Sequence, residues 1–388
     1  MFKITINKVV LALAVILVAT GCKKDYDPGV TPAPTPGGQA AAIDWNKAAD
    51  SSTGSLMGKF WNASGNYFND KNTSTVFNYW PQAHGLDVLV DAYTRTSDNK
   101  YKTYMNNWYT GVKQKNGNGF INEYYDDMGW NGLAMLRAYD VTNEEKFKAG
   151  VEEVWEDIKK GWNNTMGGGI AWRKQMPYYK NTPANGPAAI LAARLYTRFK
   201  NPDDLEWSKK IYAFIRDNLF NKSTGWVYDG INEKDDGKLN TEWKFTYNQG
   251  LFIGAAIELY KITNESSYLS DALLAANFTL SDNVLTNLND NLLRDEGGVD
   301  GGLFKGVFVR YFTQLILTQG VLSSDKQRYV AYLKHNAQTM WSKGTDKNYL
   351  LYGSYWKNAP GATTDLTVQL SGAMLIEAAA LLKKNNLF

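Results

Sequence analysis

One short pattern recurs along the chain and limits the folds that the chain can adopt. In each copy an apolar segment ends in a tyrosine, and after two intervening residues come a threonine, an asparagine or serine, and an acid. The clear copies end at residues 93–98, 139–144 and 260–265, and a degenerate copy ends at 196–204. An apolar helix, a tight turn and a second helix that begins with acids account for each copy. Such repeats indicate an architecture built from helix pairs.

The chain divides into about twelve predicted helices that alternate in character. Every second one is rich in Ala and Gly, which suits close packing on more than one side, whereas the others, such as 144–160, are amphipathic and charged. We therefore predict an all-α fold, an (α/α)6 barrel in which six helical hairpins form an inner and an outer ring. The predicted helices are centred near residues 50, 88, 106, 132, 151, 191, 210, 255, 273, 311, 333 and 375.

The segments that precede the predicted inner helices are long and carry Gly, Trp, Asn and Tyr. They include residues 77–84, 167–187, 225–248 and 294–304. Long connections gathered at one end of a barrel are where a binding cleft forms. Short β pieces are expected there, for example at 225–229, but no run alternates long enough for a large sheet.

Two neighbouring acids, Asp126 and Asp127, open one of the predicted inner helices. Acids in a first turn are ordinary, because the unpaired N–H groups and the dipole of a helix N-terminus attract negative charge. Here Tyr124, Tyr125 and Trp130 surround the pair, and aromatic rings both desolvate carboxyl groups and stack against sugars. Side chains of adjacent residues can also reach the separation of about 5–5.5 Å that a retaining glycosidase uses. The pair is therefore a candidate catalytic pair for glycoside hydrolysis.

Four segments, in order along the chain, resemble one known family. They are YDDMGW at 125–130, GGGIAW at 167–172, TYNQG at 246–250 and GLFKGVFVRY at 302–311. The first resembles the Asp-Asp signature of glycoside hydrolase family 76, the bacterial and fungal endo-α-1,6-mannanases. The resemblance covers the chain from about Trp45 to the C-terminus.

The resemblance implies an enzyme that cleaves internal α-1,6-mannosidic bonds by a retaining mechanism with two carboxyl groups. It implies that Asp126 is the nucleophile and Asp127 the acid/base, since the spacing of adjacent acids does not by itself say which carboxyl group takes which role. The implied partner is an α-mannan polysaccharide or oligosaccharide. No cofactor is implied.

Further polar and aromatic residues lie on the same predicted rim and are candidates for sugar binding. Amides and carboxylates recognise sugar hydroxyls, and aromatic rings stack on the faces of pyranose rings. The set consists of Tyr125, Trp130, Trp80, His84, Trp172, Arg173, Trp226, Asp229, Tyr247, Asn248, Gln249 and Phe304.

Each of these candidates has an ordinary structural alternative. A lone histidine such as His84 is more often a hydrogen-bonded structural group than a ligand. Asn248 is also suited to capping a helix, and the aromatic rings are also suited to the core. Arg173 and Asp229 would also suit ion pairs at the surface. The sequence leaves these alternatives open.

The N-terminal region has the features of a bacterial lipoprotein. The apolar run at 9–18 is too short for a comfortable membrane span, so residues 1–21 are predicted to be a signal peptide. Cys22 is the only cysteine, follows small residues and is predicted to be lipidated. Residues 22–42 are predicted to form a Pro- and Gly-rich tether, with the hydrolase domain at 43–388. The expected location is the outer membrane, facing the cell surface or the periplasm, with the lipid anchor as the only membrane contact.

Charge and histidine content exclude several classes of function. The formal net charge of the chain is +3 and falls to +1 without the predicted signal peptide, so nothing supports binding to nucleic acid. The two histidines, His84 and His335, lie far apart in the sequence without a ligand spacing, so no metal is expected. No phosphate-binding loop or dinucleotide fingerprint is present. We expect a monomer.

Three other functions remain open from the sequence. Aromatic residues make up 14% of the chain, and exposed rings on a tethered helical toroid would also serve a non-catalytic glycan-binding lipoprotein. The same acid pair would serve a transglycosylase, in which a sugar instead of water captures the covalent intermediate. Helical barrels also host epimerases and lyases, which usually rely on histidine, and the chain has only two.

Overall fold

The computed structural model of the chain describes residues 42–388, and residues 43–388 form one compact unit. The predicted signal peptide (1–21), the lipidation site at Cys22 and all but the last residue of the predicted tether lie outside the described residues. They stay predictions.

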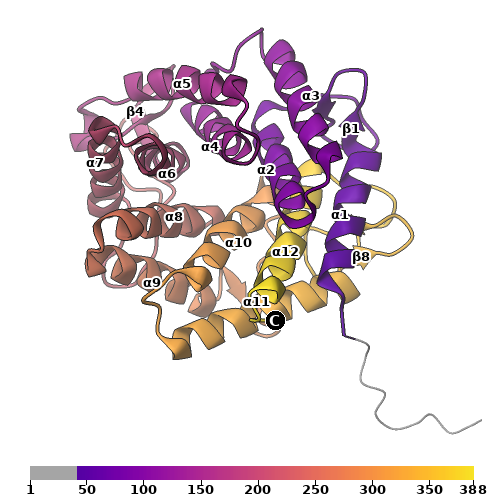
Figure 1. Cartoon of the computed structure of the whole chain (residues 1–388). Helices are drawn as coiled ribbons and strands as arrows, with labels where there is room; N and C mark the ends of the chain where they lie inside the picture. Colours follow the sequence, from indigo (N-terminus) through magenta and orange to yellow (C-terminus); the bar gives the residue numbers. More distant parts are fainter. Residues whose placement is uncertain (1–41) are drawn as a thin grey trace, which may run out of the picture. The chain divides into compact units, whose positions relative to one another are not determined.

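Twelve α-helices in the described part of the chain form two concentric rings, which confirms the predicted (α/α)6 barrel (Figure 1). The even-numbered helices form the inner ring, and the odd-numbered helices pack around them. Helix α12 packs against α2, which closes the inner ring. The helices are α1 (Trp45–Phe60), α2 (Tyr79–Thr96), α3 (Asn99–Lys115), α4 (Tyr125–Thr142), α5 (Glu145–Lys160), α6 (Thr182–Phe199), α7 (Pro202–Asn218), α8 (Thr246–Thr263), α9 (Ser266–Ser281), α10 (Gly301–Leu317), α11 (Ser323–Ser342) and α12 (Leu366–Lys384).

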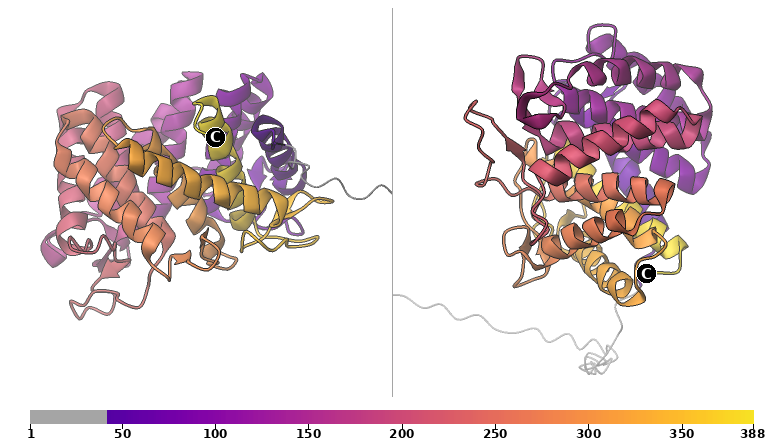
Figure 2. Two further views of the ribbon diagram at one scale, coloured as in Figure 1. Left: turned by 90° about the horizontal axis from the view of Figure 1, so that it is seen from below. Right: turned by 90° about the vertical axis from the view of Figure 1, so that its left-hand side faces the viewer.

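The long connections gather at the end of the barrel where the inner helices begin (Figure 2). Helix α12 is the only helix among residues 42–388 that is long and apolar enough to cross a membrane. However, 89% of its most apolar window is buried inside the structure. It is therefore a core helix of the inner ring.

The recurring sequence pattern forms the turn at which an inner helix ends. In α2, α4, α6 and α8 the residue four positions after the recurring tyrosine has a φ between 55° and 62° and donates its N–H to the tyrosine carbonyl. In three copies the threonine hydroxyl donates to the carbonyl four residues earlier and accepts the N–H of the following acid. Threonine thus satisfies groups that a helix end leaves unpaired, and asparagine tolerates the left-handed conformation. The left-handed residues are Ser97, Asn143, Lys200 and Asn264.

Short antiparallel strands lie in the connections and form no large sheet, as predicted. The predicted piece at 225–229 forms only a bridge between Val227 and Phe220, and the nearest strand begins at Gly230. The strands pair as β1 with β2, β4 with both β3 and β5, β6 with β7, and β8 with β9. They are β1 (Trp61–Asn62), β2 (Tyr67–Phe68), β3 (Ala171–Arg173), β4 (Met176–Asn181), β5 (Gly230–Ile231), β6 (Thr286–Asn287), β7 (Leu292–Leu293), β8 (Thr345–Asp346) and β9 (Leu351–Tyr352).

Four inner helices hold the preceding connection through a buried side-chain amide, an arrangement that we call an amide clamp. The amide belongs to the fourth residue of the helix in each case. Its oxygen accepts a backbone N–H of the connection and its nitrogen donates to a backbone carbonyl there, so buried backbone groups are satisfied. Gln82 holds Phe68, Asn185 holds Ile170, Gln249 holds Gly225 and Val227, and Gln369 holds Leu350 and Tyr352.

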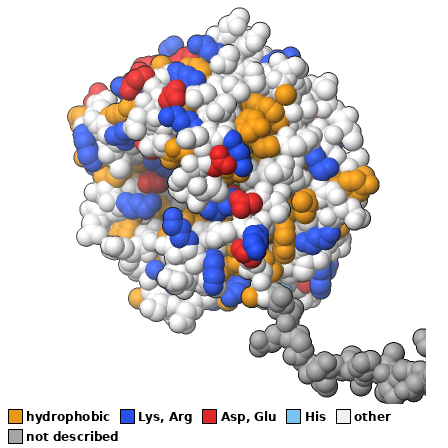
Figure 3. All heavy atoms as spheres, turned by 45° about the vertical axis from the view of Figure 1, so that its right-hand side comes forward, with side chains coloured by type: hydrophobic (Ala, Val, Ile, Leu, Met, Phe, Trp, Pro, Cys, Tyr) orange, Lys and Arg blue, Asp and Glu red, His pale blue; other side chains and the backbone are white. Residues whose placement is uncertain are grey.

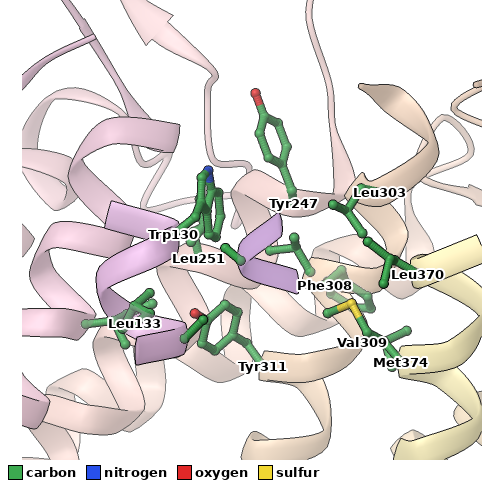
Figure 4. Close-up of a cluster of buried hydrophobic side chains, with 14 of the residues drawn as sticks. Trp130, Leu133, Tyr247, Leu251, Leu303, Phe308, Val309, Tyr311, Leu370 and Met374 are labelled. Carbon is green, nitrogen blue, oxygen red and sulfur yellow. The ribbon is translucent and has the colours of Figure 1, made fainter. Parts of the chain in front are cut away.

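Side chains of the inner helices fill the middle of the barrel (Figure 4). Gly250 allows α8 and α10 to approach closely, because a Cβ atom at this position would lie 2.6 Å from the Cα atom of Phe308. The indole nitrogen of Trp130 and the hydroxyl of Tyr247 point to the same side, away from Leu133. The apolar filling therefore ends where these two polar atoms begin.

At the other end of the inner helices, ion pairs join three of them. Asp87 and Asp91 of α2 pair with Arg137 of α4 and with Arg310 of α10, with 2.8 Å between Arg310 Nη2 and Asp91 Oδ2. Asp91 and both arginines line a cavity of about 440 Å³.

Candidate active site

The two adjacent acids lie in the first turn of α4, at the end of the barrel where the long connections gather. The side chains of Asp126 and Asp127 are both partly exposed. Met128 and Trp130, which follow them, are buried in the barrel and fix the start of the helix. Both acids are therefore accessible on a rigid element.

The two carboxyl groups differ in the hydrogen bonds that they receive. Oδ1 of Asp126 accepts the backbone N–H of Asp127 at 3.0 Å, and Oδ2 accepts the Nε1–H of Trp172 at 3.0 Å. The carboxyl group of Asp127 receives no hydrogen bond from any residue between 42 and 388. Because hydrogen bonds to a carboxylate favour the charged form, Asp126 is the better stabilised anion of the two.

Burial raises the pKa of both acids. For Asp126, burial outweighs the hydrogen bonds from Asp127 and Trp172 and raises the pKa to about 7. For Asp127, burial and the negative charges of Asp126 and Asp300 raise the pKa well above the usual range of a carboxyl group. Burial therefore opposes ionisation of both carboxyl groups, and the two hydrogen bonds favour the charge on Asp126 over the charge on Asp127. One carboxylate beside one carboxylic acid is the charge state that hydrolysis by two carboxyl groups requires.

A buried aspartate from the connection before α8 organises polar groups beside Asp126. Oδ1 of Asp229 accepts hydrogen bonds from the hydroxyl of Tyr247 and the Nδ2 of Asn248, both at 3.0 Å, and Oδ2 accepts the hydroxyl of Tyr179 at 3.1 Å. Asp229 is close enough to Asp126 for its charge to raise the pKa of Asp126. Three residues that the sequence presented as separate candidates thus form one network.

Aromatic rings surround the indole of Trp172, which donates to the Asp126 carboxyl group. The ring of Trp172 is 5.3 Å from that of Tyr124 and 5.8 Å from that of Tyr179, with near-perpendicular planes in the second pair. The guanidinium of Arg173 lies 5.1 Å from the centroid of Trp172 and pairs with Glu123 at 3.2 Å. The contacts of Arg173 hold Trp172 and Tyr124 in place.

Phe304 supports the ring of Tyr247. The two rings are stacked, with centroids 3.9 Å apart and an angle of 8° between the planes. Phe245 packs on Phe304 edge to face at 5.2 Å. This stack fixes the phenol that donates to Asp229.

A second group of predicted residues lies towards Asp127. His84 is buried between Trp80 and Trp130, with ring centroids 5.6 Å and 5.1 Å away. Trp80 donates its Nε1–H to Asp300 at 2.8 Å, and the charge of Asp300 acts on Asp127. Burial lowers the pKa of His84 to about 4, so the imidazole is neutral at physiological pH.

The side chains of three predicted sugar contacts are engaged in other contacts within the protein. Tyr125 is buried, and its ring packs against Gly161, where a Cβ atom would lie 2.9 Å from the ring. Trp226 lies under the ammonium group of Lys244, which is 4.8 Å from its ring. Gln249 is fully buried, and the amide clamp uses its polar atoms.

Three residues near the acids were absent from the predicted set. Tyr124 takes the place expected for Tyr125, because the residue before the helix and its first residue point in different directions. Asp300 directly precedes α10, and an acid at a helix start on the predicted rim was a usable signal. Tyr179 lies within β4 and had no distinguishing sequence signal.

The groups around Asp126 are carboxylates, phenols, an indole and an amide, which suit the recognition of hydroxyl groups. Among residues 42–388, no three His, Cys, Asp or Glu side chains converge as metal ligands. On the face shown in Figure 3, basic and acidic side chains are interspersed. That face presents no field of a single sign.

A model of the family described as "Glycosyl hydrolase family 76" matches residues 44–387. The chain belongs to this family. The match confirms the resemblance that the four sequence segments predicted.

Two fungal relatives of the family are similar to parts of the chain. The mannan endo-1,6-alpha-mannosidase DCW1 of Candida glabrata is 27% identical over 209 residues, which are 48% of this chain and 46% of that protein. The corresponding protein of Saccharomyces cerevisiae is 30% identical over 151 residues, which are 36% of this chain and 34% of that protein. The chain thus spans less than half the length of these two relatives.

Solved structures of the family match almost the whole described part. The α-1,6-mannanase of Salegentibacter sp. HEL1_6 is 41% identical, with a TM-score of 0.84, and the match covers 87% of this chain and 100% of that one. An inactive variant of the same mannanase, with two consecutive aspartates replaced by alanine, was solved with α-1,6-mannotetraose. The family 76 protein Bt3792 of Bacteroides thetaiotaomicron is 23% identical, with a TM-score of 0.77, and shows the same fold.

Proposed function

We propose that the chain hydrolyses internal α-1,6-mannosidic bonds of a mannan backbone, with net retention of the anomeric configuration. The unequal environment of the two adjacent acids carries this proposal. Asp126 accepts two hydrogen bonds, whereas the carboxyl group of Asp127 accepts none from the described residues, and burial and the charges of Asp126 and Asp300 raise its pKa. This inequality matches the division between a nucleophile and a general acid.

In the first step the Asp126 carboxylate bonds to the anomeric carbon. The bond from this carbon to the leaving oxygen breaks, and the proton of Asp127 passes to that oxygen. In the second step Asp127 takes a proton from water, the water oxygen bonds to the anomeric carbon, and the Asp126 carboxylate is released. Trp172 fixes the orientation of Asp126 in both steps, and Asp229 orients the phenol of Tyr247 and the amide of Asn248 beside it.

The relatives support the choice of substrate. The proteins from the two yeasts are named for activity on α-1,6-linked mannan, and the Salegentibacter enzyme binds an α-1,6-linked tetrasaccharide when two consecutive aspartates are missing. Asp126 and Asp127 are consecutive aspartates with unequal surroundings. The proposed sugar-binding set consists of Trp130, Trp80, His84, Trp172, Arg173, Asp229, Tyr247, Asn248 and Phe304, together with Tyr124 and Tyr179.

The test is product analysis of a linear α-1,6-mannan digest. We expect a ladder of shorter oligosaccharides from the earliest times and, by NMR, new reducing ends that are first formed in the α configuration. Release of mannose alone would contradict the internal mode, and β ends formed first would contradict retention. Products longer than the substrate would indicate transglycosylation. If prolonged incubation produced no new reducing ends, the result would contradict the enzyme proposal and favour a non-catalytic glycan-binding protein.

The pH dependence of the reaction tests the role of Trp172. Replacing Trp172 by phenylalanine removes a hydrogen bond that favours the Asp126 carboxylate, so the pKa of Asp126, about 7 in the wild type, rises. Because the nucleophile must be ionised, the acidic limb of the kcat/KM profile moves to higher pH, with a loss of about fivefold at pH 7 for a shift of about one unit. The measurement is kcat/KM between about pH 5 and pH 9. Trp341→Phe, on the outer helix α11, is the control and leaves the limb in place; an unmoved limb in Trp172→Phe would contradict the assigned role.

We also propose that the protein is a monomeric outer-membrane lipoprotein anchored through Cys22. The support is the sequence pattern of the N-terminal region, with its apolar run, small residues and single cysteine. Metabolic labelling with a fatty acid tests this proposal. Label is expected in the wild type and not in Cys22→Ser.

A further inference from the structure

A second concave site lies on the same end of the barrel as the acids. It is a cavity of about 370 Å³ between the connection before α10 and the connection before α12. Its lining includes Lys71, Asp295, Tyr355, Asn358 and Asp365. Cavities that bind small molecules have volumes of about 300–1,000 Å³, so this one suits a ligand of the size of a single sugar residue.

Short contacts connect this cavity to the catalytic pair. Asp365 lines the cavity and accepts the backbone N–H of Val299 at 2.8 Å. The next residue, Asp300, accepts the Nε1–H of Trp80 at 2.8 Å, and its charge acts on Asp127. Only the short segment 299–300 therefore separates the cavity from the acids, so a chain of sugars bound at the acids would extend towards the cavity.

The walls of the cavity are held in place by contacts that leave other polar groups free. Asp365 is fixed by Lys71 at 3.2 Å, and the hydroxyl of Tyr355 donates to Asp290 at 2.5 Å. By contrast, the side chain of Asn358, which is exposed, makes no hydrogen bond with any residue that the structure describes. The same is true of the exposed hydroxyl of Thr363, which also lines the cavity. The cavity is therefore preformed and has unoccupied donors and acceptors at its mouth.

The lining indicates a neutral ligand with many hydroxyl groups. Hydroxyl, amide and carboxylate groups alternate with one phenol ring, which matches the polar edge and flat face of a pyranose. The lining carries two carboxylates, Asp295 and Asp365, and one cation, Lys71. This excess of negative charge disfavours acidic sugars and phosphate. A large apolar ligand would leave these polar groups unpaired.

We propose that this cavity is an accessory subsite that binds one neutral hexose residue of the substrate. The inference rests on the proposed mannanase function, because it places the ligand on the glycan that the acids cleave. The bound residue is either a distal unit of the α-1,6 backbone or a mannosyl side chain of that backbone. These two sources share their chemistry, and the experiment separates them.

Binding is measured by isothermal titration calorimetry with Asp126→Asn as the parent, so that no turnover interferes. The ligands are linear α-1,6-mannotriose, linear α-1,6-mannohexaose and an α-1,6-mannan fragment with mannosyl side chains. Thr363→Trp fills the cavity and Asn358→Ala removes a free amide, while Asn348→Ala replaces an exposed asparagine that does not line the cavity. All three positions are exposed, so the variants are expected to fold.

We expect Thr363→Trp to weaken binding of at least one of the longer or branched ligands by about tenfold, with a smaller loss for Asn358→Ala and none for Asn348→Ala. A loss for the linear hexaose identifies a distal backbone residue, and a loss confined to the branched fragment identifies a side chain. Equal affinity of parent and Thr363→Trp for all three ligands would overturn the proposal, and so would an equal loss for the triose. Hydrolysis by the wild type is assayed separately, so failure of the mannanase function remains distinguishable from failure of the subsite.

Discussion

Replacing Asp126 by asparagine is expected to lower the rate of hydrolysis of linear α-1,6-mannan by at least about 10³-fold, because the variant has no carboxylate to form the covalent intermediate. Asp127→Asn is expected to cause a similar loss on mannan, where the leaving sugar needs a proton. An aryl mannoside with a good leaving group needs no proton from Asp127. On this substrate we expect the rate of the first step to recover in Asp127→Asn and to stay low in Asp126→Asn. The measurement is the initial rate of formation of reducing ends or released phenol.

Azide separates the two roles further. With an activated α-mannoside, Asp127→Ala is expected to form the α-mannosyl azide, because azide captures the covalent intermediate. Asp126→Ala is expected to form the β-mannosyl azide by direct displacement. Asp203→Asn is the matched control, since Asp203 is an exposed first-turn acid of the outer helix α7. The reverse pattern of azides would exchange the assigned roles.

Stability provides a check that these variants remain folded. Burial raises the pKa of both acids, so the folded state resists their ionisation. A neutral asparagine removes that cost, and Asp126→Asn and Asp127→Asn are expected to unfold at a temperature equal to or above that of the wild type. Activity and stability then change in opposite directions.

Asp87→Ala is expected to destabilise the barrel by about 3–5 kcal/mol, the range found when one partner of a buried ion pair is removed. Only 8% of the Asp87 side chain is exposed, and it pairs with Arg137 of α4 and Arg310 of α10. The variant leaves both guanidinium groups with Asp91 as their only acid partner among the residues described. The measurement is the free energy of unfolding in urea at pH 7.

Asp50→Ala is the matched control for this ion-pair prediction. Asp50 pairs with Arg95 at 2.8 Å, but 57% of its side chain is exposed, so a change of at most about 1 kcal/mol is expected. Equal losses for Asp50→Ala and Asp87→Ala would refute a special role of the ion pairs that join α2, α4 and α10.

The same ion pairs predict how stability depends on pH. Burial opposes the ionisation of Asp91, but Arg137 and Arg310 outweigh it and lower the pKa of Asp91 to about 2. An aspartate in the unfolded chain has a pKa of about 3.9. The contribution of Asp91 is therefore complete above about pH 4 and is lost as the pH falls towards 2. Asp87→Ala, which disturbs the same pairs, is expected to show a smaller loss of stability across this interval than the wild type.

The sequence was most informative where local chemistry repeats. The copies at Tyr93, Tyr139 and Tyr260 end inner helices by one mechanism, and that mechanism needs threonine and a residue that tolerates a positive φ. Twelve helices and their alternation could be predicted for this reason. The adjacent acids could be located because a helix start, unlike a loop, has a recognisable pattern.

The directions of individual side chains could not be predicted in the same way. Whether Tyr124 or Tyr125 faces the acids depends on where α4 begins, to within one residue. Gln249 carries the groups expected of a sugar ligand, and only its burial shows that they bind the connection instead. The network on Asp229 joins residues from β4 and α8 that are far apart in the sequence.

The four amide clamps fix the ends of the connections to the inner helices independently of the loop tips. Each tie depends on one glutamine or asparagine of an inner helix and on backbone atoms of the connection, whose side chains are not involved. The loop tips beyond the amide clamps, such as 233–238, can therefore be exchanged or lengthened without loosening the ends that they join. Variation confined to these tips would change the surface around the acid pair and leave the acid pair where it is.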